Sequence, residues 1–301
     1  MHRSDHWCRD LLGLWTPPGH PSGDYGLRLA IRDGYMNFYR RGQSVARVGF
    51  DRSGEPQLSV HAKYVCTDEE RGLPNLRYAG LRDSELTHRG LPTRPYEGVR
   101  TLQSWIEVID KHFTKTDGEK PLIDALLGVR ENANVIDLEM ALPASVANSA
   151  APRMDVVTVE QLRDRLSVVF GEVKRVDDSR IRCGKEGTPE VLRQLAAYAA
   201  YLGDDRRRGA VGKAYAHTAQ RLVRLNAWAA SVRGEMGLGE AIERAAKEAS
   251  LGVVKEAVLV VISTGRFSGP HWQVHADRLR SAGVRITELS DADPMNLGAL
   301  V

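Results

Sequence analysis

The strongest constraint on the fold is an alternation of strand and helix patterns that begins near residue 134. Val258–Ser263 is almost entirely apolar, residues 154–159 and 167–175 are rich in β-branched side chains, and residues 284–289 form a last short run of this kind. Apolar residues at helical spacing fill residues 188–202, 206–233, 238–250 and 271–282. Apolar strands separated by helices form a sheet that is covered on both faces. We therefore expect an α/β (α+β) fold with a mixed β-sheet in this part of the chain.

The first hundred residues have a different pattern. Residues 25–65 alternate apolar and polar side chains in short runs, with Asp33-Gly34 as a strong hairpin signal and Ser53-Gly54 as a weaker one. They predict an antiparallel β-meander, whereas residues 66–100 lack periodicity and favour a connector. We expect a β-rich region over residues 1–100, for substrate recognition or dimerisation, and a second domain over residues 101–301 that opens with helices at 102–113 and 121–129.

Charge and hydropathy exclude several classes of protein. The 301 residues carry 42 basic and 39 acidic side chains, and the net charge of +3 is too small to indicate a partner. The longest apolar run, residues 257–262, is far shorter than the roughly 20 residues that cross a bilayer, and the N-terminus is polar. We expect a cytoplasmic protein without a membrane partner. The chain has no phosphate-binding Gly-x-x-x-x-Gly-Lys-Ser/Thr loop, so an ATPase function would have to come from another protein.

Carboxylates and a lysine occupy two of the predicted strands. Asp155 lies near the start of one, and Glu172-Val173-Lys174 lies in the next, so that Glu172 and Lys174 point to the same face. If the strands form a hairpin, Asp155 lies opposite Glu172 and the two carboxylates can bind one Mg²⁺. Lys174 would then orient or deprotonate a water molecule and offset charge on a phosphate. This set of residues predicts metal-dependent hydrolysis of a phosphodiester.

The pattern Asp155-x16-Glu172-Val173-Lys174 resembles the core motif of the PD-(D/E)XK, or restriction-endonuclease-like, nuclease superfamily. Met154 stands where the family name has proline. Upstream, Glu139 is similar in position to a metal-site glutamate that many members carry on their first core helix, and Asp137 competes with it for this role.

A second motif extends the resemblance. Gln194 and Tyr198, which lie four residues apart on one helix face, resemble the Gln-x-x-x-Tyr motif of the branch related to helicase-associated and exonuclease-type nucleases. The match covers residues 103–205 and leaves out the N-terminal meander. It implies a restriction-endonuclease-like mixed sheet flanked by helices.

The resemblance also implies an activity and a set of roles. The protein would be a Mg²⁺-dependent nuclease, with Mn²⁺ as a possible substitute, that acts on nucleic acid, above all DNA, in restriction, antiviral defence or repair. Asp155, Glu172 and Lys174 would be catalytic, and Glu139 would join Asp155 and Glu172 as a metal ligand. Gln194 and Tyr198 would contact the substrate or support the metal ligands.

A basic stretch follows the predicted active-site helix. Residues 203–234 hold seven basic and two acidic side chains, and Lys213, His217, Arg221 and Arg224 share one helical face. Such a face can bind the phosphate backbone, although it can equally be a solvated surface.

Two other functions remain open at this point. The chain could be a nucleic-acid-binding or complex-assembly protein without catalytic activity, or it could be an RNase. As an enzyme it could form a homo-oligomer, or bind a protein that supplies recognition or ATPase function.

Overall fold

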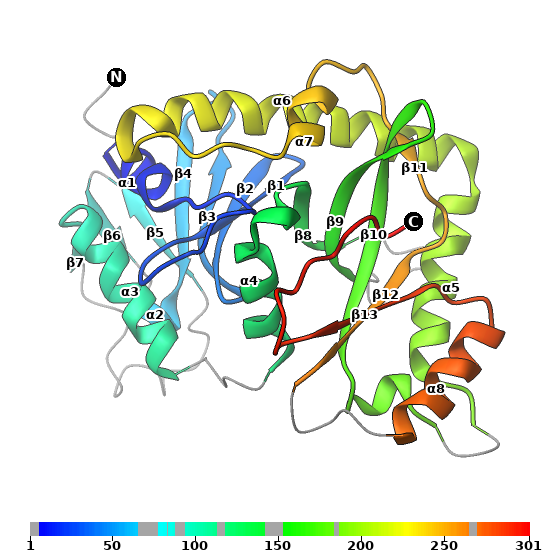
Figure 1. The fold of residues 1–301 in the computed structure, drawn as a ribbon. Coiled ribbons are helices and arrows are strands. Elements are labelled where there is room, and N and C mark those ends of the chain that lie inside the picture. The colour runs from blue at the N-terminus through cyan, green and yellow to red at the C-terminus, as the bar shows by residue number, and fades with distance from the viewer. Residues whose placement is uncertain are drawn as a thin grey trace. The chain divides into compact units, whose positions relative to one another are not determined.

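The computed structural model describes residues 6–65, 78–82, 84–87, 94–112, 118–141, 153–183, 187–264 and 270–301 (Figure 1). The chain forms two compact units. Unit 1 comprises Met1–Pro17, Pro21–Asp124 and Leu225–Gly237, and unit 2 comprises Pro18–His20, Ala125–Arg224 and Leu238–Val301. Between Asp124 and Ala125 the chain passes from unit 1 to unit 2 within one helix.

Unit 1 contains a seven-stranded antiparallel sheet whose strands follow one another in chain order. Its strands are β1 (Arg28–Arg32), β2 (Tyr35–Arg40), β3 (Gln43–Phe50), β4 (Pro56–His61), β5 (Tyr78–Arg82), β6 (Glu85–Thr87) and β7 (Arg94–Pro95). The predicted meander is confirmed, because Arg32 pairs with Tyr35 across the Asp33-Gly34 turn. The expectation of an unstructured connector over residues 66–100 is wrong for its described part. Strands β5 to β7 are too short to show a period of two, and they form because they extend the edge at β4.

The helices of unit 1 include α1 (His6–Leu14), α2 (Ala62–Val65), α3 (Val99–His112) and the first half of α4 (Glu119–Gly128). Two of them, α3 and α4, hold buried arginines of the sheet. The Arg40 guanidinium lies 2.7 Å from Asp110 on α3, and that of Arg28 lies 3.1 Å from Asp124 on α4. Both arginines are 2% exposed, and a buried charge needs such a partner. These ion pairs explain why residues 99–124 belong to the same unit as the meander.

Unit 2 contains the expected mixed sheet, with strand order β13-β12-β10-β9-β8 and β11 added beside β10. Its strands are β8 (Val135–Ala141), β9 (Arg153–Leu162), β10 (Arg165–Arg175), β11 (Gly252–Val253), β12 (Val258–Ser263) and β13 (Ile286–Ser290). Strands β8, β9 and β10 are antiparallel, whereas β10, β12 and β13 run parallel to one another. The coarse prediction of an α+β protein with two kinds of sheet is thus confirmed.

Helices accompany this sheet. They are α5 (Glu190–Gly203), α6 (Asp205–Arg233) as far as Arg224, α7 (Glu240–Ala245) and α8 (Pro270–Ser281), with the 3₁₀ helices η3 (Arg130–Asn132) and η4 (Ser179–Ile181). The expected helix over residues 238–250 is shorter than predicted, because Leu251 donates to the Gly212 carbonyl and leads into β11. Pro189 occupies the N-cap position of α5. In the parts of the chain that the structure describes, no helix has both the length and the apolarity needed to span a bilayer.

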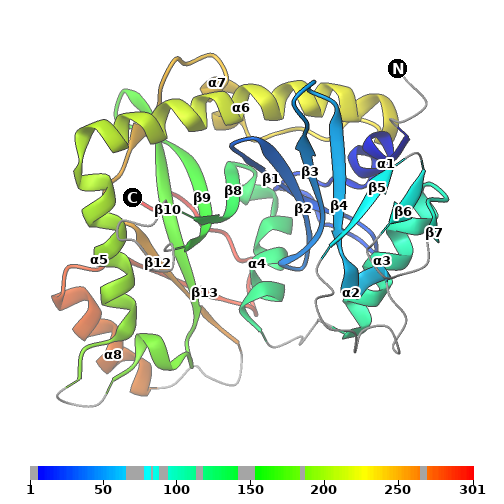
Figure 2. The same ribbon diagram turned by 180° about the vertical axis from the view of Figure 1, so that it is seen from behind.

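The two faces of the sheet in unit 2 have different surroundings. Figures 1 and 2 show α5 and α8 next to each other beside the sheet. On the other face, a Cβ atom at Gly171 would lie 2.8 Å from Val156 Cγ2 and 3.6 Å from Leu300 Cδ1. The residue before Glu172 must therefore be small, because its face is tightly packed.

Candidate metal and catalytic site

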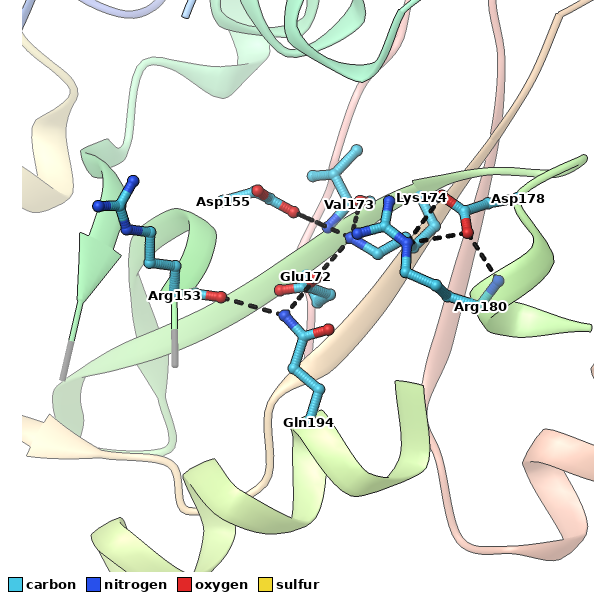
Figure 3. A network of polar contacts seen from close by, with 8 residues as sticks. All are labelled: Arg153, Asp155, Glu172, Val173, Lys174, Asp178, Arg180 and Gln194. Atoms are coloured by element: carbon cyan, nitrogen blue, oxygen red, sulfur yellow. Dashed lines mark hydrogen bonds and ion pairs between the residues drawn. The ribbon is translucent and has the colours of Figure 1, made fainter. Parts of the chain in front are cut away.

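The β9–β10 hairpin brings Asp155 and Glu172 together, as the sequence predicted. Gly171 pairs with Val156, and one step further along the same register Glu172 lies opposite Asp155. The Asp155 Oδ2 atom accepts a hydrogen bond of 2.8 Å from the Val173 amide, which fixes its orientation (Figure 3). Opposite residues of antiparallel strands share a face, so both carboxylates point to the side where α5 lies.

Lys174 lies between these two carboxylates. Its Nζ atom forms an ion pair with Glu172 Oε1, lies 3.6 Å from Asp155 Oδ2 and donates to the Val173 carbonyl at 2.8 Å. Glu172 and Lys174 are each 1% exposed, whereas the Asp155 side chain is 16% exposed. The period of two along β10 puts Glu172 and Lys174 on one face, and the hairpin adds Asp155 from β9. The result is a buried cluster of two carboxylates and one ammonium, with Asp155 nearest to solvent.

Asp155 titrates unusually for an aspartate. Burial, followed by the negative charge of Glu172, raises the pKa of Asp155 from its ordinary value to about 7, and the Lys174 charge only partly opposes this. At neutral pH the group is therefore poised between its protonated and charged forms. A strongly perturbed carboxyl beside a buried lysine is typical of functional sites.

Helix α5 places Gln194 and Tyr198 over the carboxylates. The Gln194 amide nitrogen donates to Glu172 Oε1 at 2.7 Å and to the Arg153 carbonyl at 3.3 Å (Figure 3). Tyr198 is fully buried, and its hydroxyl has no hydrogen-bond partner among the described residues. Burial, followed by the charges of Glu172 and Asp155, raises the pKa of Tyr198. Both residues of the second motif therefore belong to the same cluster as the first.

Strand β8 carries both upstream acids, whereas the glutamate with which Glu139 was compared lies on a helix in many nucleases of the PD-(D/E)XK type. The pairs Leu138–Val156 and Met140–Met154 flank Glu139 and Asp155, which places Glu139 in one row with Asp155 and Glu172 across three strands. The row arises because the β8–β9 pairing puts Glu139 opposite Asp155, and the β9–β10 pairing puts Asp155 opposite Glu172.

The conformation of Glu139 is itself unusual. Its φ of 51° lies in the left-handed region, which costs a non-glycine residue free energy and is enriched at functional sites. Its Oε2 atom lies 3.7 Å from Nη1 of the exposed Arg153. Asp137, by contrast, is buried and accepts hydrogen bonds from the Tyr215 hydroxyl at 3.0 Å and the Leu138 amide at 2.8 Å. Glu139 is therefore the better candidate for the upstream acid.

Sequence reasoning missed Arg153 and Tyr215. Arg153 contributes its carbonyl to Gln194 and its guanidinium to Glu139. Tyr215 on α6 reaches Asp137 over 78 residues of chain. No spacing or motif marks either residue, although the apolar character of α6 around Tyr215 already indicated a face that packs on the sheet.

The donor atoms of this cluster suit magnesium. Across the described parts of the chain, no three His, Cys, Asp or Glu side chains are arranged so that they could hold a metal ion between them. Mg²⁺, however, is commonly bound by one or two carboxylates, with water and phosphate oxygens completing its octahedron. Asp155 and Glu172 offer such a pair, with Glu139 in the same row.

The basic side chains of α6 lie on a different surface. Lys213, His217, Arg221 and Arg224 are all exposed, as their shared helical face predicted. The opposite face of α6, which includes Tyr215, packs on the sheet. The four basic side chains therefore point away from the carboxylates, and any contact they make with a polyanion lies outside the cluster.

Taken together, these residues form a buried site that combines hard anionic ligands, an ammonium and a carboxyl that titrates near neutrality. No protein-family model, curated protein or solved structure matches this chain. The functional argument therefore depends on the geometry and chemistry of the site.

Proposed function

We propose that this protein is a metal-dependent nuclease that hydrolyses phosphodiester bonds, with DNA as the expected substrate. The observation that carries the proposal is the buried cluster of Asp155, Glu172 and Lys174, on which Gln194 and Tyr198 converge. Residues brought together from β9, β10 and α5 agree with the set that the resemblance to PD-(D/E)XK nucleases implies. The mixed sheet of unit 2 is the element that we propose as the restriction-endonuclease-like core.

The cluster assigns a task to each residue. Asp155 and Glu172 would hold Mg²⁺ or Mn²⁺ through carboxylate oxygens, and Glu139 would contribute from β8. When bound, the ion would supply Lewis-acid polarisation of a phosphoryl oxygen. Lys174 orients the attacking water and offsets the negative charge that develops on the phosphoryl group. Gln194 fixes the Glu172 carboxylate by its hydrogen bond, so that this group keeps one orientation.

A basic surface outside the cluster is compatible with a polyanionic substrate. The exposed row of Lys213, His217, Arg221 and Arg224 on α6 is a surface to which a phosphate backbone can bind by charge alone. We place the protein in the cytoplasm, in restriction, antiviral defence or repair. It would act as a homo-oligomer or together with a protein that supplies recognition or ATPase function, and the meander of unit 1 is the surface we propose for such contacts.

Cleavage of defined substrates tests the function. The purified protein is incubated with supercoiled, linear and single-stranded DNA and with RNA, in Mg²⁺, Mn²⁺ or EDTA. We expect DNA to be cut with either metal and to stay intact in EDTA. Cleavage of RNA alone would identify an RNase, and a folded preparation that binds nucleic acid but cuts none of these substrates would contradict the enzymatic proposal in favour of a binding protein.

A further inference from the structure

A cavity of about 450 Å³ lies in unit 2, on the face of the sheet away from the candidate site. Thr158 and Glu160 of β9 line it, and the period of two along this strand directs them away from the side to which Asp155 points. The other walls come from η3 and the start of β8, from α7 and from residues 296–299. Small-molecule sites have volumes of roughly 300–1,000 Å³, so this cavity has the size of a ligand pocket.

Hydrogen bonds between distant parts of the chain hold the walls in place. The Asn132 side chain joins η3 to residues 295–297 by donating to a carbonyl at 2.7 Å and accepting from an amide at 2.8 Å. Asn134 Oδ1 accepts a hydrogen bond of 3.1 Å from the Ala241 amide at the start of α7. The pocket is therefore formed by the fold itself, and a ligand that enters it does not have to order the walls.

Glu160 places a buried carboxylate in this cavity. The residue is 8% exposed, and its described partners are neutral donors. Oε1 accepts hydrogen bonds of 2.7 Å from the Thr158 hydroxyl and 3.0 Å from the Leu300 amide, whereas Oε2 accepts one long bond of 3.4 Å from the Val301 amide. A carboxylate offers about four acceptor positions, and a buried charge is normally paired. Oε2 therefore keeps capacity for a positively charged donor.

The rest of the lining adds to the negative potential. Glu131 and Glu240 also line the cavity, and both are exposed, so the cavity is open to solvent on their side. Arg244 is the basic residue of the described lining, and it donates to Gln161 Oε1 at 2.6 Å. Three carboxylates against one guanidinium attract a cation and repel an anion.

The cavity also has an apolar wall. Val135, Val159 and Leu297 are buried residues of its lining. Such a wall favours hydrocarbon over water. A ligand that fits the whole lining carries one positively charged nitrogen for Glu160, a second one for the exposed carboxylates, and an alkyl chain that covers the apolar wall.

We propose that this cavity binds a short aliphatic diamine, with one ammonium group at Glu160 and the other near Glu131 and Glu240. The assignment does not depend on nuclease activity, because no residue of the cavity belongs to the carboxylate cluster around Asp155. A diamine bound here stabilises the folded protein, since the walls that hold it come together only on folding.

Isothermal titration calorimetry with three small molecules tests the chemistry of the site. Putrescine, butylamine and butanediol share one carbon chain and carry two, one and no positive charges. We expect putrescine to bind at a single site, butylamine to bind more weakly, and butanediol to give no saturable heat. Added salt should weaken the binding of putrescine, because it screens the exposed carboxylates.

Variants of the wall locate the site. Glu160→Gln keeps the shape of the side chain and should weaken putrescine binding by roughly tenfold or more, because it loses a charge-assisted hydrogen bond. Glu240→Gln alters an exposed residue and should weaken binding by about threefold. Glu248→Gln is the matched control, since Glu248 is exposed and outside the lining, and this variant should bind like the wild type. Asp155→Asn should also bind like the wild type.

The outcomes separate this proposal from the nuclease proposal. Lack of saturable putrescine binding to the folded protein would overturn the site, whether or not the protein cuts DNA. Butanediol that binds as tightly as putrescine, or a folded Glu160→Gln that binds like the wild type, would overturn the role of the charge. If Glu160→Gln does not fold, equal binding by Glu240→Gln and Glu248→Gln would do so. Loss of binding in Asp155→Asn would move the diamine to the carboxylate cluster and contradict the assignment.

Discussion

Replacing Asp155 by asparagine removes a charge that the folded protein holds at a cost. Asparagine has nearly the same shape, and its carbonyl oxygen can still accept the hydrogen bond from the Val173 amide. The change therefore tests the electrostatics of the cluster without removing its packing.

The size of the effect follows from the pKa of Asp155. It rises from 3.8 in the unfolded chain to about 7 in the folded one, and at 1.36 kcal/mol per pK unit this gives about 4 kcal/mol. The folded-state pKa is the higher one, so the folded protein binds the proton more tightly. This contribution to stability is complete below the unfolded pKa and is lost as the pH rises through 7. Roughly 3 kcal/mol of the loss falls between pH 5 and pH 8.

Urea denaturation followed by circular dichroism, in EDTA at pH 5 and pH 8, measures this difference. Asp155→Asn should gain stability relative to the wild type as the pH rises, by roughly 3 kcal/mol over this interval. Adding Mg²⁺ at pH 8 should stabilise the wild type, because a bound cation offsets the cost of burying the charged Asp155 carboxylate. It should leave the stability of Asp155→Asn unchanged, because this variant has no carboxylate at that position. Parallel pH profiles for the two proteins would refute the reasoning.

Three further variants test other parts of the account. Lys174→Gln leaves the buried Glu172 and Asp155 carboxylates without their ammonium partner. In urea denaturation it should lower the free energy of unfolding by about 3–5 kcal/mol at pH 8 and by less at pH 5. Equal losses at the two pH values would contradict this expectation. Tyr215→Phe removes the hydroxyl that donates to Asp137 and should destabilise the protein by about 1–3 kcal/mol in the same assay, whereas no loss would mean that water satisfies the carboxylate. Arg221→Gln combined with Arg224→Gln should reduce the slope of log K against log salt for DNA binding by about two, and an unchanged slope would leave this face as a solvated surface.

Sequence reasoning was most successful where local chemistry determines the structure. Asp33-Gly34 forms a hairpin because both residues tolerate the tight turn, and β12 appears where an uninterrupted apolar run requires burial on both faces. The relation of Asp155 to Glu172 was predictable for a similar reason. The two strands are separated by a short turn, so the hairpin register follows from the spacing of the two residues.

The remaining features depend on contacts that are distant in sequence. Strands β5 to β7 exist because β4 offers an edge with which they pair, and their own sequences show no period. Asp137 and Glu139 are equivalent in the sequence, and only the Tyr215 hydroxyl and the left-handed backbone of Glu139 distinguish them.

The central claim is that Lys174 and the two carboxylates beside it hydrolyse DNA with a metal ion. The most direct measurement is the rate of cleavage of supercoiled DNA in Mg²⁺ and in EDTA by the wild type, by Lys174→Gln, and by Lys255→Gln as a control at an exposed lysine away from the cluster. We predict cleavage by the wild type and by Lys255→Gln in Mg²⁺ only, and none by a folded Lys174→Gln. Equal rates for all three proteins, or no cleavage by any of them, would contradict the claim.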